Sequence, residues 1–162
     1  MQICIVAECY GNRCVGEYLS RDVGGRVLHK PNYGRELILH SIAHELKPRC
    51  HRLIVIIDYE TSRDARRLVE AHFELRQVCE RVWIGHGKGK FAGVVAVVLD
   101  PHVEGFAERL GLNPGDKLKH EDACRHIRSE LERSKNATYK FYECLQKLKS
   151  ETKTSYLGRL NA

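Results

Sequence analysis

The sequence predicts an α/β fold: a three-layer sandwich with a mostly parallel central sheet, followed by C-terminal helices. Two observations predict it. Three segments are nearly continuous runs of apolar, largely β-branched residues, as in strands buried on both faces of a parallel sheet: 2–7 (QICIVA), 52–57 (RLIVII) and 92–99 (AGVVAVVL). Segments with apolar residues at helical spacing separate these runs, and such alternation requires crossover connections with helices on both faces of the sheet.

The length of the chain limits it to one domain. Its 162 residues, of which 43% are hydrophobic, suffice for one core and are too few for two. We expect a single domain over 1–150, with the α/β core within 1–110 and C-terminal helices within 117–149. The polar segment 151–162 is predicted to be a loose tail.

The remaining elements alternate with the long strands. Asn12 is a candidate cap of the first helix, and Thr61 or Ser62 of a later one, because their side chains can accept hydrogen bonds from N–H groups at a helix start. Gly24 and Pro48 are expected to end the first and second helices. In chain order we expect a helix toward residue 21, an extended piece over 26–29, a helix over about 33–47, a helix over about 62–73, a short strand over 82–84, and helices over 103–110, 121–133 and 136–149.

The seven cysteines indicate reduced thiols. Their number is odd, no C-x-x-C pair occurs, and the close pairs of a structural zinc site are missing. We therefore expect the thiols of a cytoplasmic protein in preference to disulfides or zinc. No apolar stretch approaches the length of a membrane span, and Met1 to Ala7 lack the basic leader of a signal peptide, so a soluble protein is expected.

The charge of the chain favours an anionic partner. The formal net charge is +6 and the isoelectric point is near 9.0. Lys and Arg clusters neutralise phosphates and release counterions, so a net positive charge favours the binding of nucleic acid, DNA or RNA. Many basic proteins bind no such partner, and the charge alone only favours this class.

Carboxylates follow each of the three long strand patterns. Glu8 follows QICIVA, Asp58 and Glu60 follow RLIVII, and Asp100 follows AGVVAVVL, with Glu104 one helical turn further on. The carboxyl ends of parallel strands meet at one edge of the sheet, where open α/β sheets bind ligands. Carboxylates gathered there repel one another unless they are protonated or neutralised, and Mg²⁺ or Mn²⁺ is the natural neutralising ion. Two such ions would clamp the attacking and leaving oxygens of a phosphodiester.

These motifs resemble those of Toprim domains, the metal-binding catalytic fold shared by topoisomerases, primases and the overcoming-lysogenization-defect class of nucleases. The Toprim pattern has a Glu after the first strand, here IVAE with Glu8, and an Asp-x-Asp after a later strand, here IVIIDYE with Asp58 and Glu60. The nuclease class adds an acidic motif after another strand, and 100–104 has the matching Asp-x-x-x-Glu form. The resemblance covers roughly 1–110 and is greatest to the small stand-alone Toprim-related proteins of bacteria and archaea.

Three positions depart from the Toprim pattern. Cys9 stands where a Gly usually follows the motif Glu, and Asn12 stands where an Asp is often found. The second acid of the pair is Glu60, which is one methylene longer than Asp.

The resemblance implies a divalent-metal-dependent phosphoryl-transfer domain that acts on nucleic acid, such as a small nuclease that hydrolyses phosphodiesters or a nucleic-acid-processing component. It implies that Glu8 is the general acid or base. Asp58 and Glu60 would bind one Mg²⁺, and Asp100 and Glu104 would support a second ion.

A loop rich in glycine and lysine, Gly85 to Lys90 (GHGKGK), is a candidate phosphate-binding segment. Lys88 and Lys90 alternate with glycines that let the backbone approach a ligand closely, and His86 could contact phosphate or transfer a proton. His102 is a similar candidate. The spacing is not that of a Walker loop, and an exposed basic loop without a ligand explains the same residues.

Two other function classes stay open. One is a non-catalytic binding module that keeps the fold and the acidic edge, for example as the partner subunit of another protein. The other is a flavodoxin-like regulatory domain with Asp58 as its strand-end acid. Such receiver-type domains usually need an acidic pair after the first strand, where Glu8 stands alone.

Overall fold

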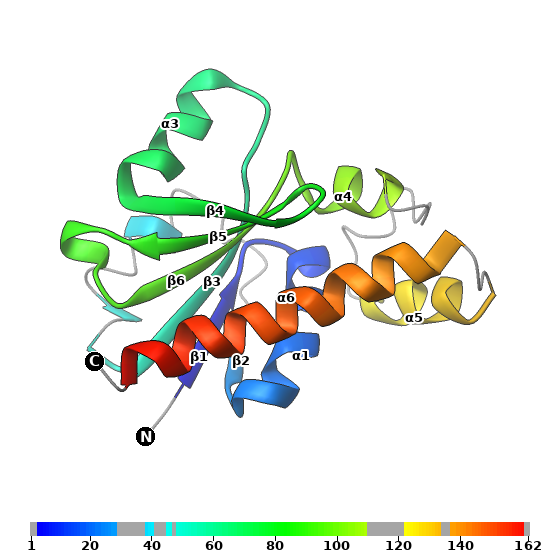
Figure 1. Ribbon diagram of the computed structural model, residues 1–162, viewed down its shortest axis with the longest axis horizontal. Helices are drawn as coiled ribbons and strands as arrows, with labels where there is room; N and C mark the ends of the chain where they lie inside the picture. Colours follow the sequence, from blue (N-terminus) through cyan, green and yellow to red (C-terminus); the bar gives the residue numbers. More distant parts are fainter. Residues whose placement is uncertain are drawn as a thin grey trace.

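The computed structural model describes residues 3–28, 38–40, 45–46, 48–109, 122–133 and 137–160, and it has the predicted α/β architecture (Figure 1). A six-stranded sheet has the strand order β2-β1-β3-β6-β5-β4. Neighbouring strands among β2, β1, β3 and β6 are parallel, whereas β5 is antiparallel to both β6 and β4. The strands are β1 (Ile3–Ala7), β2 (Arg26–Leu28), β3 (Arg52–Asp58), β4 (Phe73–Cys79), β5 (Val82–Gly87) and β6 (Val94–Leu99).

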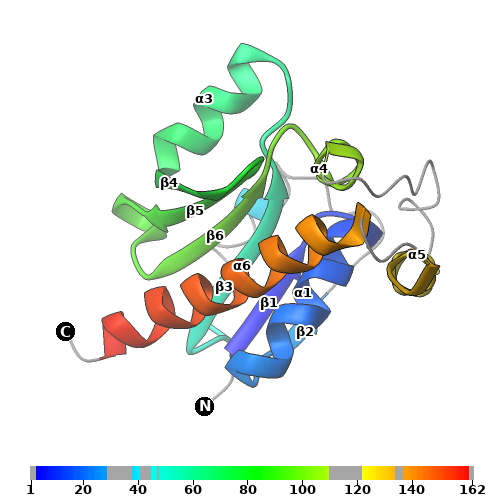
Figure 2. The ribbon, with the colours of Figure 1, turned by 45° about the vertical axis from the view of Figure 1, so that its right-hand side comes forward.

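Helices cover both faces of the sheet, which makes the three layers that the sequence predicts (Figure 2). Successive residues of a strand point to opposite faces. Ile54 and Ile56 of β3 pack on the face of α1, α4, α5 and α6, whereas Val55 and Ile57 pack on the face of α3. The helices are α1 (Tyr10–Val23), α3 (Arg63–His72), α4 (Val103–Arg109), α5 (Ala123–Arg133) and α6 (Ala137–Leu160), with a short 3₁₀ turn η2 (Gly89–Phe91) after β5.

Two of the expected helix ends are confirmed. α1 stops at Gly24, which adopts the left-handed conformation (φ 68°) and donates its N–H to the carbonyl of Ser20. Of the two candidate caps before α3, Ser62 is the one used, because its hydroxyl accepts the N–H of Ala65 at 3.2 Å. The helix expected over 33–47 lies mostly outside the described residues, and the segment 110–121 lies entirely outside them.

The strand expected over 82–84 is confirmed as part of β5, but the sequence does not predict β4 or the hairpin that joins the two strands. The helix expected to reach Phe73 ends at His72, and the chain returns as the edge strand β4. A two-residue turn at Glu80 and Arg81 joins β4 to β5, with Arg81 in a left-handed conformation (φ 67°). Hairpin turns of this kind are usually marked by Asn or Gly, and neither occurs there.

The predicted loose tail is wrong for 151–160, because α6 continues to Leu160. Thr152 is completely buried, and Glu151 forms an ion pair of 2.5 Å with Arg76 of β4. Contacts with the edge of the sheet therefore hold a segment whose polar composition resembles that of a tail. Among the described residues, no helix combines the length and apolar character needed to cross a bilayer.

Six of the seven cysteines form disulfides, contrary to the expected reduced thiols; only Cys9 is free. The bonded pairs are separated by 46, 110 and 65 residues in sequence, so only the fold brings them together. Disulfides are rare in cytosolic proteins outside hyperthermophiles, so these bonds remove the argument from reduced thiols for a cytoplasmic location. The pairs are Cys4–Cys50, Cys14–Cys124, which joins α1 to α5, and Cys79–Cys144, which joins β4 to α6.

Candidate metal centre

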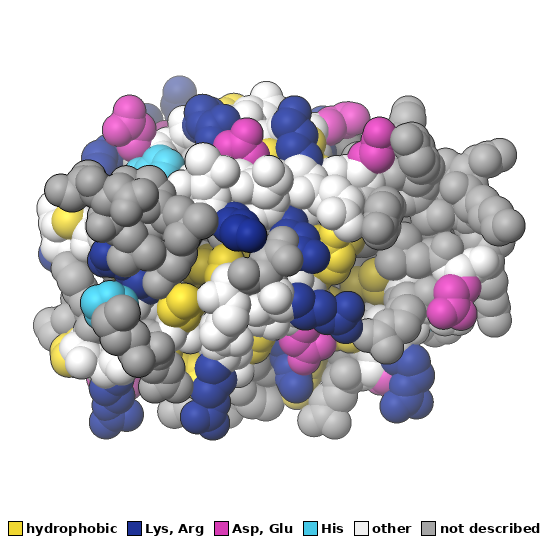
Figure 3. Space-filling view, turned by 60° about the horizontal axis from the view of Figure 1, so that its bottom comes forward, with side chains coloured by type: hydrophobic (Ala, Val, Ile, Leu, Met, Phe, Trp, Pro, Cys, Tyr) yellow, Lys and Arg dark blue, Asp and Glu magenta, His cyan; other side chains and the backbone are white. Residues whose placement is uncertain are grey.

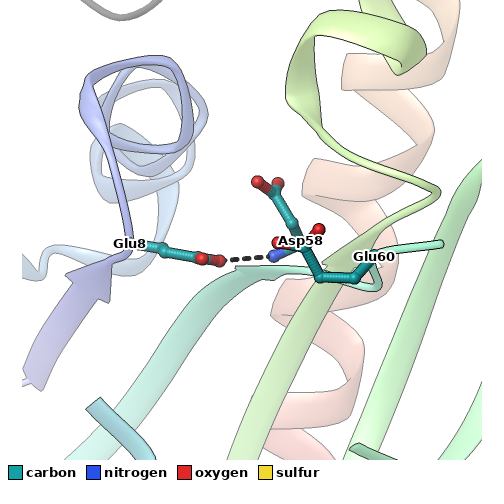
Figure 4. A group of neighbouring side chains, drawn as sticks. All are labelled: Glu8, Asp58 and Glu60. Carbon is teal, nitrogen blue, oxygen red and sulfur yellow. Dashed lines mark hydrogen bonds between the residues drawn. The ribbon is translucent and has the colours of Figure 1, made fainter. Parts of the chain in front are cut away.

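Three carboxylates meet at the carboxyl ends of β1 and β3 (Figure 4). Ala7 pairs with Ile56 in the parallel register, so Glu8 leaves β1 beside the end of β3, where Asp58 and then Glu60 follow. Each of the three acids offers one oxygen, and these oxygens all lie within 4.8 Å of one another. The predicted convergence of Glu8, Asp58 and Glu60 is confirmed. Three hard oxygen ligands this close to one another could hold a divalent cation.

The carboxylate of Glu8 is tied to the backbone of β3. Its Oε2 accepts the N–H of Asp58 at 2.8 Å, and the N–H of Glu8 donates to the carbonyl of Ile56 at 3.1 Å. These two bonds join the chain just past β1 to the end of β3. Figure 4 shows the Glu8 side chain extending across to the segment that carries the other two acids.

Asp58 is the buried member of the group, with 7% of its surface exposed. Its Oδ1 accepts hydrogen bonds from Nδ2 of Asn12 at 3.2 Å and from the N–H of Val103, the first residue of α4, at 3.1 Å. Burial and the negative charge of Glu8 nevertheless raise the pKa of Asp58 to about 8. Near neutral pH a proton or a cation must therefore balance this carboxylate.

Glu60 reaches the group through an unusual backbone conformation. Its φ is 73°, in the left-handed region, which costs a non-glycine residue about 1–2 kcal/mol. Its N–H donates to the carbonyl of Pro101 at 2.7 Å, and its carbonyl accepts Nε of Arg66 at 2.8 Å. Contacts with two other segments thus stabilise the conformation. Strained conformations of this kind cluster at functional sites.

Asp100 does not join the acidic group, contrary to the predicted second ion site. Asp58 pairs with Leu99, so the side chain of Asp100 points to the opposite face of the sheet, toward α3. There its two carboxylate oxygens contact Nη2 of Arg66 at 2.5 Å and Nε1 of Trp83 at 3.4 Å.

Glu104 lies on the rim of the group. Its charge contributes to the raised pKa of Asp58, and its Oε2 lies 3.3 Å from Nδ1 of His102. Within the part of the chain that the structure describes, Glu8, Asp58 and Glu60 are the one set of three or more His, Cys, Asp or Glu side chains placed to hold an ion. Asp100 and Glu104 therefore do not complete a second one.

The predicted phosphate loop lies near the amino end of β6, at the opposite end of the sheet from the acidic group. Because β5 is antiparallel to β6, His86 pairs with Val95 near the start of β6, roughly 13 Å along the strand from its acidic end. Lys88 donates Nζ to the carbonyl of Glu70, and Lys90 lies over the ring of Phe91. His86, Lys88 and Lys90 therefore do not belong to the acidic site.

Asn12 is a site residue whose role the sequence does not predict. The residue before α1 is Cys9, not Asn12, and Asn12 lies in the first turn of the helix, completely buried. Its Nδ2 reaches Asp58 and, at 3.5 Å, the carbonyl of Ile56, while its Oδ1 has no hydrogen-bond partner among the described residues. The available signal was its place one helical turn after Glu8, where Toprim motifs often have Asp.

Cys9, which follows Glu8, lies in an environment that disfavours the nucleophilic thiolate form. Burial raises the pKa of its thiol to about 12, so the reactive thiolate is scarcely populated at neutral pH. Its partly buried side chain packs against the hydrophobic core that includes Val15 and Leu19 of α1.

No protein-family model matches the chain, and neither a curated protein nor a solved structure shows a significant match to it.

Proposed function

We propose that the protein binds one divalent cation, Mg²⁺ or Mn²⁺, through Glu8, Asp58 and Glu60 and uses it for phosphoryl transfer on nucleic acid. One observation carries the proposal: three carboxylate oxygens, remote in sequence, lie within 4.8 Å of one another. All-oxygen ligand sets suit Mg²⁺ and Mn²⁺ better than they suit softer metals.

The electrostatics of the group support a cation. Asp58 is buried beside a second carboxylate, which disfavours its ionised form and raises its pKa to about 8. A cation in contact with Asp58, Glu8 and Glu60 removes this repulsion, because it replaces the proton that Asp58 otherwise holds. The neutral amide of Asn12 adds no further negative charge beside them.

A bound cation would polarise a phosphate oxygen and lower the pKa of a coordinated water. The residues of the chain would hold and orient it. Glu8 lies inside the ligand group, with one oxygen oriented by the N–H of Asp58. This position supports a role of Glu8 as a metal ligand. A role of Glu8 as general acid or base is the second role that we propose.

Nucleic acid is the proposed substrate for two reasons. The IVAE and IVIIDYE motifs resemble those of Toprim domains, and the chain carries a net charge of +6. The described Lys and Arg side chains are spread over the face shown in Figure 3 and do not form a single patch there.

A non-catalytic metal-binding module is the second candidate, and the position of Asp100 favours it. The expected ligand of a second ion is held by Arg66 and Trp83, so a two-ion clamp is not assembled. The antiparallel β5 argues against the flavodoxin-like alternative, whose sheet is parallel with the strand order 2-1-3-4-5.

Mn²⁺ titration of the purified protein tests the proposal. Glu8→Gln, Asp58→Asn and Glu60→Gln should each weaken binding at least about tenfold, because each removes a charged ligand. Glu74→Gln, which changes an exposed acid on β4, should leave it unchanged. Labelled single- and double-stranded DNA and RNA are then incubated with Mg²⁺ or Mn²⁺. Binding without cleavage supports the module, and a wild-type chain that binds no Mn²⁺ refutes the proposal.

A further inference from the structure

The conformation of Glu60 depends on a neighbouring arginine. Among non-glycine residues, left-handed φ values are favoured for Asn and Asp, so the Glu at 60 needs external support. The N–H of Glu60 is held by Pro101, and its carbonyl is held by Nε of Arg66 at 2.8 Å. Arg66 therefore contacts the backbone of a proposed ligand without contacting its carboxylate.

Arg66 is itself fixed in place by three contacts. Its Nη2 pairs with Asp100 at 2.5 Å, its guanidinium carbon lies 4.3 Å from the ring centroid of Tyr59, and Nε is engaged by Glu60. The side chain of Asp100 is only 10% exposed and also accepts a hydrogen bond from Trp83, so it is a firm anchor. The planar guanidinium group thus bridges the chain after β3 and the chain after β6.

We propose that Arg66 is a positioning residue of the cation site, with Asp100 as its anchor, and that it acts by holding Glu60 in the left-handed conformation that brings its carboxylate beside Glu8 and Asp58. The inference rests on the proposed cation binding by these three acids. It also gives Asp100 a role: this acid supports the ion site from the opposite face of the sheet instead of binding a second ion.

Electrostatics and positioning predict effects of opposite sign when Arg66 is replaced. A positive charge near the site repels a cation, so its removal should by itself tighten Mn²⁺ binding. If Arg66 positions Glu60, its removal frees the turn to leave the left-handed conformation, and Mn²⁺ binding weakens. The direction of the change therefore separates the two effects.

The experiment measures Mn²⁺ affinity by calorimetry for the wild type, Arg66→Gln and Arg66→Lys, with thermal unfolding as a check of folding. Both variants should bind about tenfold more weakly, because losing a residue that orients a ligand commonly costs 10- to 100-fold in affinity. Lys keeps the charge and the aliphatic stem but cannot bridge the Glu60 carbonyl and Asp100 as the guanidinium does. Arg67→Gln is the matched control, since it removes the same charge from the next, exposed position of α3 and should leave binding unchanged or slightly tighter.

Mn²⁺ affinity measured with and without Arg66→Gln in a Glu60→Gln background tests whether Arg66 acts through Glu60. Once the carboxylate of Glu60 is gone, Arg66→Gln should cause no further loss of affinity. An equal loss in both backgrounds, or Arg66→Gln binding Mn²⁺ as tightly as the wild type, overturns the positioning role and leaves the proposed function standing. A wild-type chain that binds no Mn²⁺ refutes the proposed function, and the positioning role with it.

Discussion

The side-chain amide of Asn12 donates a hydrogen bond of 3.2 Å to the carboxylate of Asp58, and so links the first turn of α1 to the end of β3 across 46 residues of sequence. Asn12 is completely buried, and Asp58 is nearly so. A hydrogen bond to the ionised form lowers the pKa of a carboxyl group, so this contact opposes the upward shift that burial and Glu8 impose on Asp58.

Replacement of Asn12 by Asp should make the protein more dependent on a cation. The variant exchanges a donor for another buried negative charge, and we expect the metal-free protein to lose about 2–4 kcal/mol of unfolding free energy. Added Mn²⁺ should raise the melting temperature of the variant more than that of the wild type, as thermal unfolding with and without Mn²⁺ will show. Ser20→Asp, which adds the same charge at the far end of α1, serves as the control and should not increase the Mn²⁺ effect.

The affinity for Mn²⁺ should rise with pH. Because the pKa of Asp58 is about 8, binding at lower pH must release a proton from this carboxyl group. We expect the association constant to increase about tenfold per pH unit between pH 6 and 8 and to level off above pH 8. Titrations at several pH values measure it. An affinity that is constant over this range would show that Asp58 is already ionised.

The stability of the metal-free protein should fall as the pH rises from about 4 to about 8. Asp58 has its ordinary pKa of 3.8 in the unfolded chain and about 8 in the folded protein, so the folded state binds more protons in this interval. The free energy of unfolding then decreases with pH. Asp58→Asn cannot titrate, and its stability relative to the wild type should increase by up to about 1.4 kcal/mol per pH unit across the interval. Denaturant unfolding of both proteins gives this difference, and a difference that does not change with pH contradicts the shift.

The parallel half of the fold and the acidic triad could be predicted because each depends on a simple rule. The runs QICIVA, RLIVII and AGVVAVVL appear as β1, β3 and β6, since continuous apolar strands must be buried on both faces. The neighbouring strands β1 and β3 are parallel and end at the same edge of the sheet, so Glu8 and Asp58 lie close together.

The parts that could not be predicted depend on strand direction and on the alternation of side chains. The hairpin turn at Arg81 lacks Asn and Gly, so the sequence carries no signal that β5 runs antiparallel to β6. This strand direction places His86, Lys88 and Lys90 away from the acidic group. The place of Asp100 after β6 predicts that it joins the site, but the alternation of side chains turns it toward Arg66.

Thiol counting should find one free cysteine per chain after denaturation without reductant, and seven after reduction, because Cys9 alone is unpaired. The native protein should react slowly, since the pKa of the Cys9 thiol is raised to about 12 by burial. Reduction should lower the melting temperature, as each lost cross-link typically costs about 2–4 kcal/mol. Seven free thiols in the unreduced protein would contradict the bonds and would restore the expectation of a reducing compartment.

A side chain at Gly87 should destabilise the fold, because the backbone of Phe91 lies too close to this position. A Cβ at this position would lie 1.8 Å from the carbonyl oxygen of Phe91, so Gly87→Ala must displace the backbone of η2. We expect a loss of about 2–4 kcal/mol in unfolding free energy. Gly89→Ala is the matched control in the same loop: it meets no atom within 4 Å and has only its left-handed φ of 56° to maintain, so the loss should be near 1 kcal/mol. Equal losses for the two variants would mean that conformational freedom, and not the close approach to Phe91, explains this glycine.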